Sequence, residues 1–241
     1  MNLAAPARRS GASTALYAAT ALTLLLYLVA WIWPPLAWLG RPLVLLATLV
    51  HELGHALAAT ALGGEVDSLR VWADASGVAQ HRGDYGAAAR ATIAAAGPLG
   101  PPLCAMLAFL AARRPERARV ALGVASVVLV LVLAAWVRNV FGVLFVAFLA
   151  ALAAVIAWRA SPRVAQVACA FLGIELCLST FARADALFAA TARTGAGAMP
   201  SDAAQIAQAL VPPYWLWGGL IALASLAILV LGLRAVLRAM R

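Results

Sequence analysis

The sequence alternates between long apolar runs and short polar breaks. The apolar runs occupy residues 15–33, 41–62 (or 35–62), 87–112, 120–158, 164–182 and 214–234. About 20 residues cross a bilayer as a helix, so the run 120–158 is long enough for two crossings. We split it at Arg138-Asn139, the polar pair near its middle. The pattern predicts an all-α polytopic membrane protein with about six to seven transmembrane helices.

The most polar part of the chain lies between the second and third runs. Residues 65–72 have the composition of a strand, and after a turn the shorter segment 78–81 has a similar one. We expect a small β-hairpin in the loop 63–86, with an ordinary solvated loop as the alternative. A second long loop, 186–213, precedes the last run. We expect a single integral membrane domain over residues 1–241.

Composition supports a membrane protein rather than a soluble one, because 65% of the residues are hydrophobic and 11% are charged. All 18 basic residues are arginine, and the formal net charge is +9. The arginines lie mostly between apolar runs and form no patch with interleaved aromatic residues. We therefore expect phospholipid headgroups, and no nucleic acid, as partners. The expected location is multi-pass in a bacterial plasma membrane.

The first apolar run follows Arg8 and Arg9, as in a signal peptide. It ends, however, at tryptophans and prolines rather than at a small-residue cleavage site, so we expect a retained transmembrane helix. If every predicted span crosses the membrane, a cytoplasmic N-terminus puts the arginines of 113–119 outside. That placement contradicts the positive-inside tendency, so the sequence leaves the orientation open. Cys104, Cys169 and Cys177 lie in apolar runs and are expected to be small core residues.

The strongest chemical motif lies inside the second run, where residues 51–55 read H-E-L-G-H. On a helix, His51 and His55 project from one face one turn apart, which suits two nitrogen ligands of one zinc ion. Glu52 lies about 100° round the helix, within reach of water near the metal. Polar groups at membrane depth are costly and are functional by default. The alternative is a buried polar cluster without a metal.

An H-E-L-G-H helix inside a membrane resembles the site-2 protease family of intramembrane zinc metalloproteases. The resemblance covers the motif helix, the loop after it and the next span, and continues more weakly into the last third. It implies a β-hairpin beside the active site, whose edge pairs with an unwound substrate segment.

Ala96-Gly97-Pro98 resembles the Ala-Gly-Pro of that family, which implies that Gly97 and Pro98 shape the substrate cavity. The Gly-Pro-Pro of residues 100–102 departs from the family pattern, and we expect the prolines to break or kink the helix. Asn139, at the break between two spans, is a candidate for polarising a substrate carbonyl or orienting a ligand. The alternative for Asn139 is a residue at a helix end.

The third zinc ligand is not given by the motif. Catalytic zinc normally has three protein ligands, and the family supplies the third from a Leu-Asp-Gly motif that this sequence lacks. A divergent branch carries an Asp after a late span, then a Ser-Asp-Ala segment and a Trp-rich last helix. Asp185, Ser201-Asp202-Ala203, Trp215 and Trp217 resemble that pattern. We expect Asp185 as the third ligand, with Asp202 as the alternative and Glu175 after it.

Together these residues predict an intramembrane zinc metalloprotease with one catalytic zinc ion. His51, His55 and Asp185 would bind the metal, and Glu52 would act as general base toward a membrane protein or peptide substrate. The alternative is a catalytically silent membrane scaffold of the same fold, which the missing Leu-Asp-Gly motif favours. A transporter would show internal repeats and paired intramembrane charges, and the sequence has neither. The sequence specifies neither the substrate nor the oligomeric state.

Overall fold

The computed structural model describes residues 7–182 and 184–240. Within them, seven helical segments are long and apolar enough to cross a membrane. The helices are α1 (Ala7–Ile32), α2 (Arg41–Ala61), α3 (Ala87–Ala111), α4 (Pro115–Ala135), α5 (Val140–Arg159), α6 (Pro162–Ala182) and α8 (Tyr214–Met240). The predicted spans are confirmed, including the break at Arg138-Asn139 between α4 and α5. The chain is an integral, multi-pass membrane protein.

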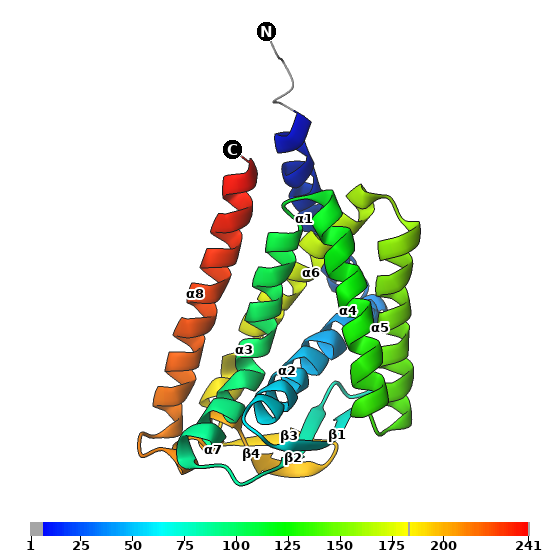
Figure 1. Cartoon of the computed structure of the whole chain (residues 1–241). Coiled ribbons are helices and arrows are strands. Elements are labelled where there is room, and N and C mark those ends of the chain that lie inside the picture. The colour runs from blue at the N-terminus through cyan, green and yellow to red at the C-terminus, as the bar shows by residue number, and fades with distance from the viewer. Residues whose placement is uncertain (1–6, 183, 241) are drawn as a thin grey trace.

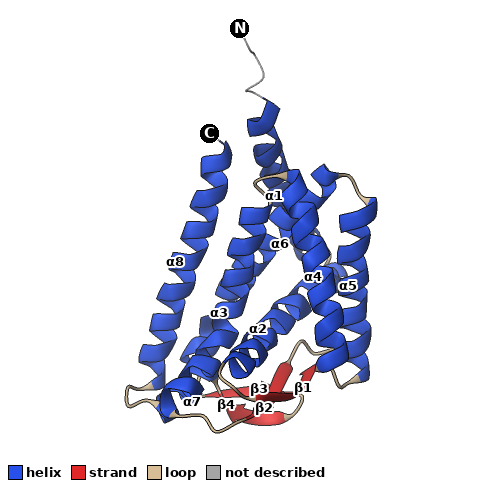
Figure 2. Cartoon of the chain, viewed as in Figure 1, coloured by secondary structure: helices blue, strands red, loops and turns tan. Residues whose placement is uncertain are grey.

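The strands and α7 gather at one end of the helix bundle (Figure 2). They are β1 (Glu65–Val71), β2 (Gly77–Arg82), β3 (Thr191–Thr194), β4 (Gly197–Pro200) and α7 (Asp202–Ala209). Two 3-10 helices, η1 (Pro34–Gly40) and η2 (Ala184–Phe188), precede α2 and β3. β1 pairs with β2 and β3 with β4, both antiparallel. The hairpin predicted in the loop 63–86 is therefore confirmed. The β3–β4 hairpin in the late loop was not predicted.

Glycines let α2 and α3 approach closely, as helices in membranes commonly do through small residues. A Cβ added at Gly54 would lie 2.2 Å from the Ala96 carbonyl oxygen, and one at Gly100 would lie 2.7 Å from the Val50 carbonyl oxygen. Side chains larger than hydrogen at these positions would push the helices apart. The motif helix is thus held against the helix that carries Gly97 and Pro98.

The helix α3 runs unbroken through Pro98, Pro101 and Pro102. The expected break is therefore not present, although proline removes a backbone donor and usually disturbs a helix. Gly100, Pro101 and Pro102 are buried against the protein, where irregular hydrogen bonding is tolerated at membrane depth.

The β1–β2 hairpin is seated on α2, α4 and α5 by a buried cluster that includes Leu49, Leu69, Val71 and Val146. The outer edge of β1 is extended by the segment between α4 and α5. Leu69 N donates to the Trp136 carbonyl at 2.7 Å, and Arg138 N donates to the Leu69 carbonyl at 3.2 Å. The hairpin is therefore held both by packing against the helices and by backbone hydrogen bonds along β1.

The motif helix lies along this hairpin instead of leading away from it. The Arg41 guanidinium, at the first residue of α2, donates to the Ala73 carbonyl at 2.9 Å. Further along α2, the Thr48 hydroxyl donates to the Ala75 carbonyl at 2.8 Å. Figure 1 shows α2 strongly inclined to the neighbouring helices, with the strands beneath it. α1 begins, and α8 ends, at the opposite end of the bundle.

Candidate metal centre and cavity

The two histidines of the motif meet on one face of α2, as the four-residue spacing predicts. Their Nε2 atoms are 3.2 Å apart. The Nδ1 atom of His55 lies 2.8 Å from the carbonyl oxygen of Ile93 on α3. A carbonyl can only accept, so Nδ1 of His55 carries the proton and, in the neutral imidazole, Nε2 keeps its lone pair. Such a hydrogen bond is the usual way in which a metal-binding histidine is oriented.

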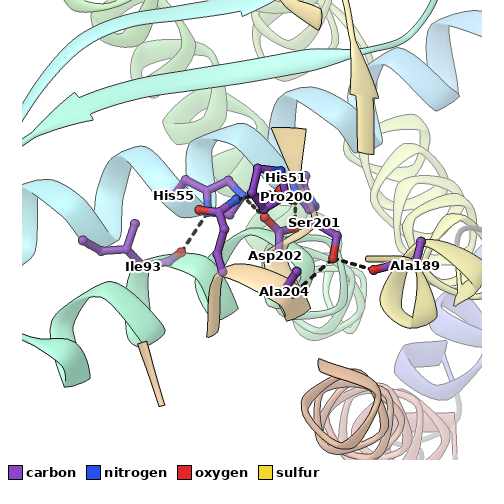
Figure 3. Close-up of polar contacts among 9 residues, drawn as sticks. His51, His55, Ile93, Ala189, Pro200, Ser201, Asp202 and Ala204 are labelled. Carbon is purple, nitrogen blue, oxygen red and sulfur yellow. Dashed lines mark hydrogen bonds and ion pairs between the residues drawn. The ribbon is translucent and has the colours of Figure 1, made fainter. Parts of the chain in front are cut away.

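A carboxylate from a distant part of the chain completes this group. Asp202 Oδ2 lies 3.1 Å from His51 Nε2, and Asp202 Oδ1 lies 3.2 Å from His55 Nε2 (Figure 3). The three side chains are partly enclosed, with exposed fractions of 28%, 12% and 21% for His51, His55 and Asp202. The four-residue spacing of the histidines and a contact between distant parts of the chain thus bring together three donors of the kind that zinc prefers.

Asp202 is held by the start of α7. It is the first residue of that helix, and Ser201 before it is the N-cap. The Ser201 hydroxyl accepts from Ala204 N at 3.1 Å and donates to the Ala189 carbonyl at 2.6 Å (Figure 3). Ser201 is itself buried. The serine before Asp202 therefore has a structural role, because its cap fixes the start of the helix that carries Asp202.

The donor set fits a single zinc ion. Two ligands about 2.05 Å from a tetrahedral zinc are separated by about 3.3 Å. The 3.2 Å between the two Nε2 atoms is close to one edge of such a tetrahedron, and each Nε2 atom has one oxygen of Asp202 within 3.1 or 3.2 Å. Burial on its own would raise the pKa of the Asp202 carboxyl, but without a metal the protonated imidazoles of His55 and His51 outweigh it and hold that pKa below its usual range. The carboxylate is therefore ionised and available as a ligand.

Glu52 and the histidines line one cavity of about 500 Å³. Glu52 is buried, and β2 packs directly over it. A Cβ added at Gly77 would lie 2.7 Å from Glu52 Cγ and 3.0 Å from Glu52 Oε1. The absence of a side chain at Gly77 therefore leaves room for the Glu52 carboxyl beside the two imidazoles.

Gly97 and Pro98 of α3 lie against this site. A Cβ added at Gly97 would lie 2.1 Å from His55 Nε2. Pro98 lines the cavity. Gly97 is thus the residue that makes space for the His55 ring.

Asp185 is not part of the group formed by His51, His55 and Asp202. It is exposed in the first turn of η2. The sequence favoured Asp185 over Asp202, but in the structure Asp202 lines the cavity beside the two histidines and Asp185 does not. The position of Asp185 directly after a predicted span did not show which carboxylate lies near α2 in the fold.

Asn139 is the N-cap residue of α5, which agrees with the alternative of a residue at a helix end. It is not among the cavity-lining residues. Its amide nitrogen donates to the Val71 carbonyl at 2.7 Å, and its amide oxygen accepts from Val71 N at 3.3 Å. Asn139 therefore continues the pairing along the edge of β1. In the structure it fixes the hairpin to the start of α5.

The remaining polar candidates lie around or away from the site. Glu175 is buried between α6 and α1, where it accepts from the Thr23 hydroxyl at 2.9 Å. His81 on β2 lines the cavity, and burial, followed by the nearby charge of His55, lowers the pKa of its imidazole. Cys104, Cys169 and Cys177 are free thiols.

Sequence reasoning missed the second wall of the cavity. Thr191, Arg193 and Met199 of the β3–β4 hairpin line it opposite β2. The tips of the two hairpins touch, since Gly195 N donates to the Ser76 hydroxyl at 2.9 Å. The sequence sign of this hairpin was the glycine-rich segment 195–197 between two short runs. In the structure, Gly197 has a φ of +113°.

Comparison with known proteins agrees with this geometry. A family model described as Peptidase M50B-like matches residues 19–232, which include both hairpins and all three donors. No curated protein matches the sequence. No solved structure matches it either.

Proposed function

The chain belongs to the Peptidase M50B-like family, and from this premise we propose that it is an intramembrane zinc metalloprotease. The observation that carries the proposal is the convergence of His51, His55 and Asp202, whose donor atoms all lie within 4.8 Å of one another. This set supplies the third ligand without a Leu-Asp-Gly motif. The absence of that motif therefore no longer favours a catalytically silent scaffold.

In the proposed mechanism, His51, His55 and Asp202 hold the metal. A zinc ion there would lower the pKa of water and polarise the scissile carbonyl. The Glu52 carboxylate accepts a proton from the attacking water and delivers it to the leaving amine nitrogen. Ile93 and Gly97 keep the His55 ring in place, and Ser201 keeps Asp202 in place.

The proposed substrate is an unwound segment of a membrane protein or peptide. In a helix, the peptide bonds are engaged in hydrogen bonds and shielded by side chains, so the segment must become extended before attack. The outer edge of β1 is already occupied by the segment 136–139. β2 lines the cavity, and we propose that the extended substrate pairs along it as an added strand.

The test measures zinc content and cleavage of a model transmembrane segment on the same purified samples. The parent should bind about one zinc per chain, as a mononuclear site requires. Glu52→Gln should keep the metal and lose cleavage, because it removes the base but none of the three ligands. Asp202→Asn should lose both metal and cleavage.

Asp185→Asn is the matched control, because it makes the same chemical change at an exposed carboxylate outside the group. It should retain zinc and activity. A parent that binds no zinc at any metal concentration would refute the proposal. So would an Asp202→Asn protein with unchanged zinc affinity.

A further inference from the structure

The lining of the cavity carries positive charge in addition to the metal centre. Three arginines line it, namely Arg82 of β2, Arg90 of α3 and Arg193 of β3. Among the described residues, the acids of the lining are Glu52 and Asp202 alone. These two carboxylates together balance the charge of one zinc ion, so they leave the three arginines without compensation.

Arg82 is neutralised by acids outside the lining, whereas Arg90 and Arg193 are not. Arg82 is paired with Glu65 at 2.6 Å and with Asp67 at 2.9 Å. In the part of the chain that the structure describes, Arg90 and Arg193 form no ion pair and donate no side-chain hydrogen bond. Both residues are exposed, so their side chains are accessible to a ligand that enters the cavity.

Arg90 lies on the His55 side of the metal centre. It is on α3 one turn before Ile93, whose carbonyl oxygen is 2.8 Å from Nδ1 of His55. Residues three and four apart share one face of a helix, and Ile93 and Ala94 line the cavity together with Arg90. The start of α3 adds to the positive potential there, because it has no side-chain cap and no acidic residue in its first turn.

Arg193 lies at the other end of the cavity, where the hairpin tips meet. Two residues after it, Gly195 N donates to the Ser76 hydroxyl at 2.9 Å. Ser76 directly precedes Gly77, which lies against Glu52. Arg90, in contrast, follows the far end of β2 after the short connection 83–86. A substrate strand paired along β2 would therefore have one arginine near each end, with the metal ligands between them.

We propose that Arg90 and Arg193 make the cavity select acidic substrate segments, and that each arginine binds a carboxylate on its own side of the cleaved bond. This inference rests on the proposed function and names the substrate class of the same site. A guanidinium and a carboxylate form two parallel, charge-assisted hydrogen bonds. A basic segment would be repelled by both arginines, and a neutral segment would gain little from them.

The proposal is tested by binding to the zinc-loaded Glu52→Gln protein, in which the peptide is not cleaved. Three labelled peptides share one apolar centre and are flanked on both sides by Asp, Asn or Lys. Fluorescence anisotropy in detergent measures the affinities. The Asp peptide should bind more tightly than the Asn peptide by about five-fold per arginine, and the Lys peptide should bind most weakly. Added salt should reduce these differences.

Charge reversal identifies the residues that are responsible. Arg90→Glu and Arg193→Glu, each made in the Glu52→Gln protein, should lower affinity for the Asp peptide and raise affinity for the Lys peptide. Arg70→Glu is the matched control, because it makes the same change at an exposed arginine of β1 outside the lining. It should keep the parent order of the three peptides.

Equal binding of the Asp and Asn peptides would overturn the proposal. So would an Arg70→Glu protein that changed the order of the peptides as much as the two lining variants do. The same peptides are offered to the parent, where cleavage tests the proposed function. A parent that prefers the Asp peptide but cleaves none of the three would contradict the protease function and support the acidic selection.

Discussion

At the scale of single residues, the site depends on positions that have no side chain. Gly97 and Gly77 lie against His55 and Glu52, respectively, at distances that exclude a methyl group. Sequence analysis singled out Gly97 only through a family resemblance and did not single out Gly77. Neither requirement is visible in the sequence, because it arises from the contact of two segments that are far apart in the chain.

Gly97→Ala should weaken zinc binding at least about ten-fold, because the new methyl group would displace the His55 ring from its ligand position. Equilibrium dialysis against a competing chelator measures the affinity. Gly123→Ala, in α4, is the matched control, since the atom nearest to its added Cβ is Ala157 Cβ of α5, 3.9 Å away. An unchanged zinc affinity in a folded Gly97→Ala protein would show that His55 is not a ligand.

At the scale of elements, the length of the apolar runs predicted the spans, and strand and turn composition predicted the first hairpin. The apolar runs are long, and the break at Arg138-Asn139 is polar enough to separate α4 from α5. The β3–β4 hairpin was not predicted because each of its strands has four residues, too few to show an alternation of polar and apolar positions. The choice of Asp202 over Asp185 depends on how α7 folds back toward α2, which local patterns do not encode.

Asn139→Asp tests the structural role that replaces the expected catalytic one. The carboxylate would keep an acceptor for Val71 N but would place a second oxygen against the Val71 carbonyl. We expect a loss of about 1–3 kcal/mol in the free energy of unfolding. Thermal unfolding in detergent measures it. Zinc content should stay at the parent level. Loss of zinc from a folded variant would show that Asn139 contributes to the metal centre.

At the scale of the whole molecule, α1 is attached to the rest of the bundle by a stripe of small residues. Ala12, Ala15 and Ala19 are buried, and Thr23 continues the stripe to Glu175 on α6. Tyr27 of α1 also interacts electrostatically with Glu175. This arrangement explains a buried acidic residue that the proposed reaction does not use.

Replacing Glu175 separates this attachment from the metal centre. Glu175→Leu should destabilise the protein by about 1–3 kcal/mol, because it leaves the buried Thr23 hydroxyl without its acceptor. Glu175→Gln keeps an acceptor oxygen of the same shape and should be much closer to the parent. Thermal unfolding compares the two, and both should retain zinc. A folded Glu175→Gln protein that lost zinc would reopen Glu175 as the third ligand.

The contact between the two hairpin tips has a consequence for the size of the products. Ser76 and Gly195 join the two walls of the cavity at the end where Glu52 lies beside Gly77. If a substrate strand pairs along β2 as proposed, the joined tips would limit how far that strand extends beyond Gly77. The cleavage position would then depend on the distance from this limit, and side-chain identity would matter less.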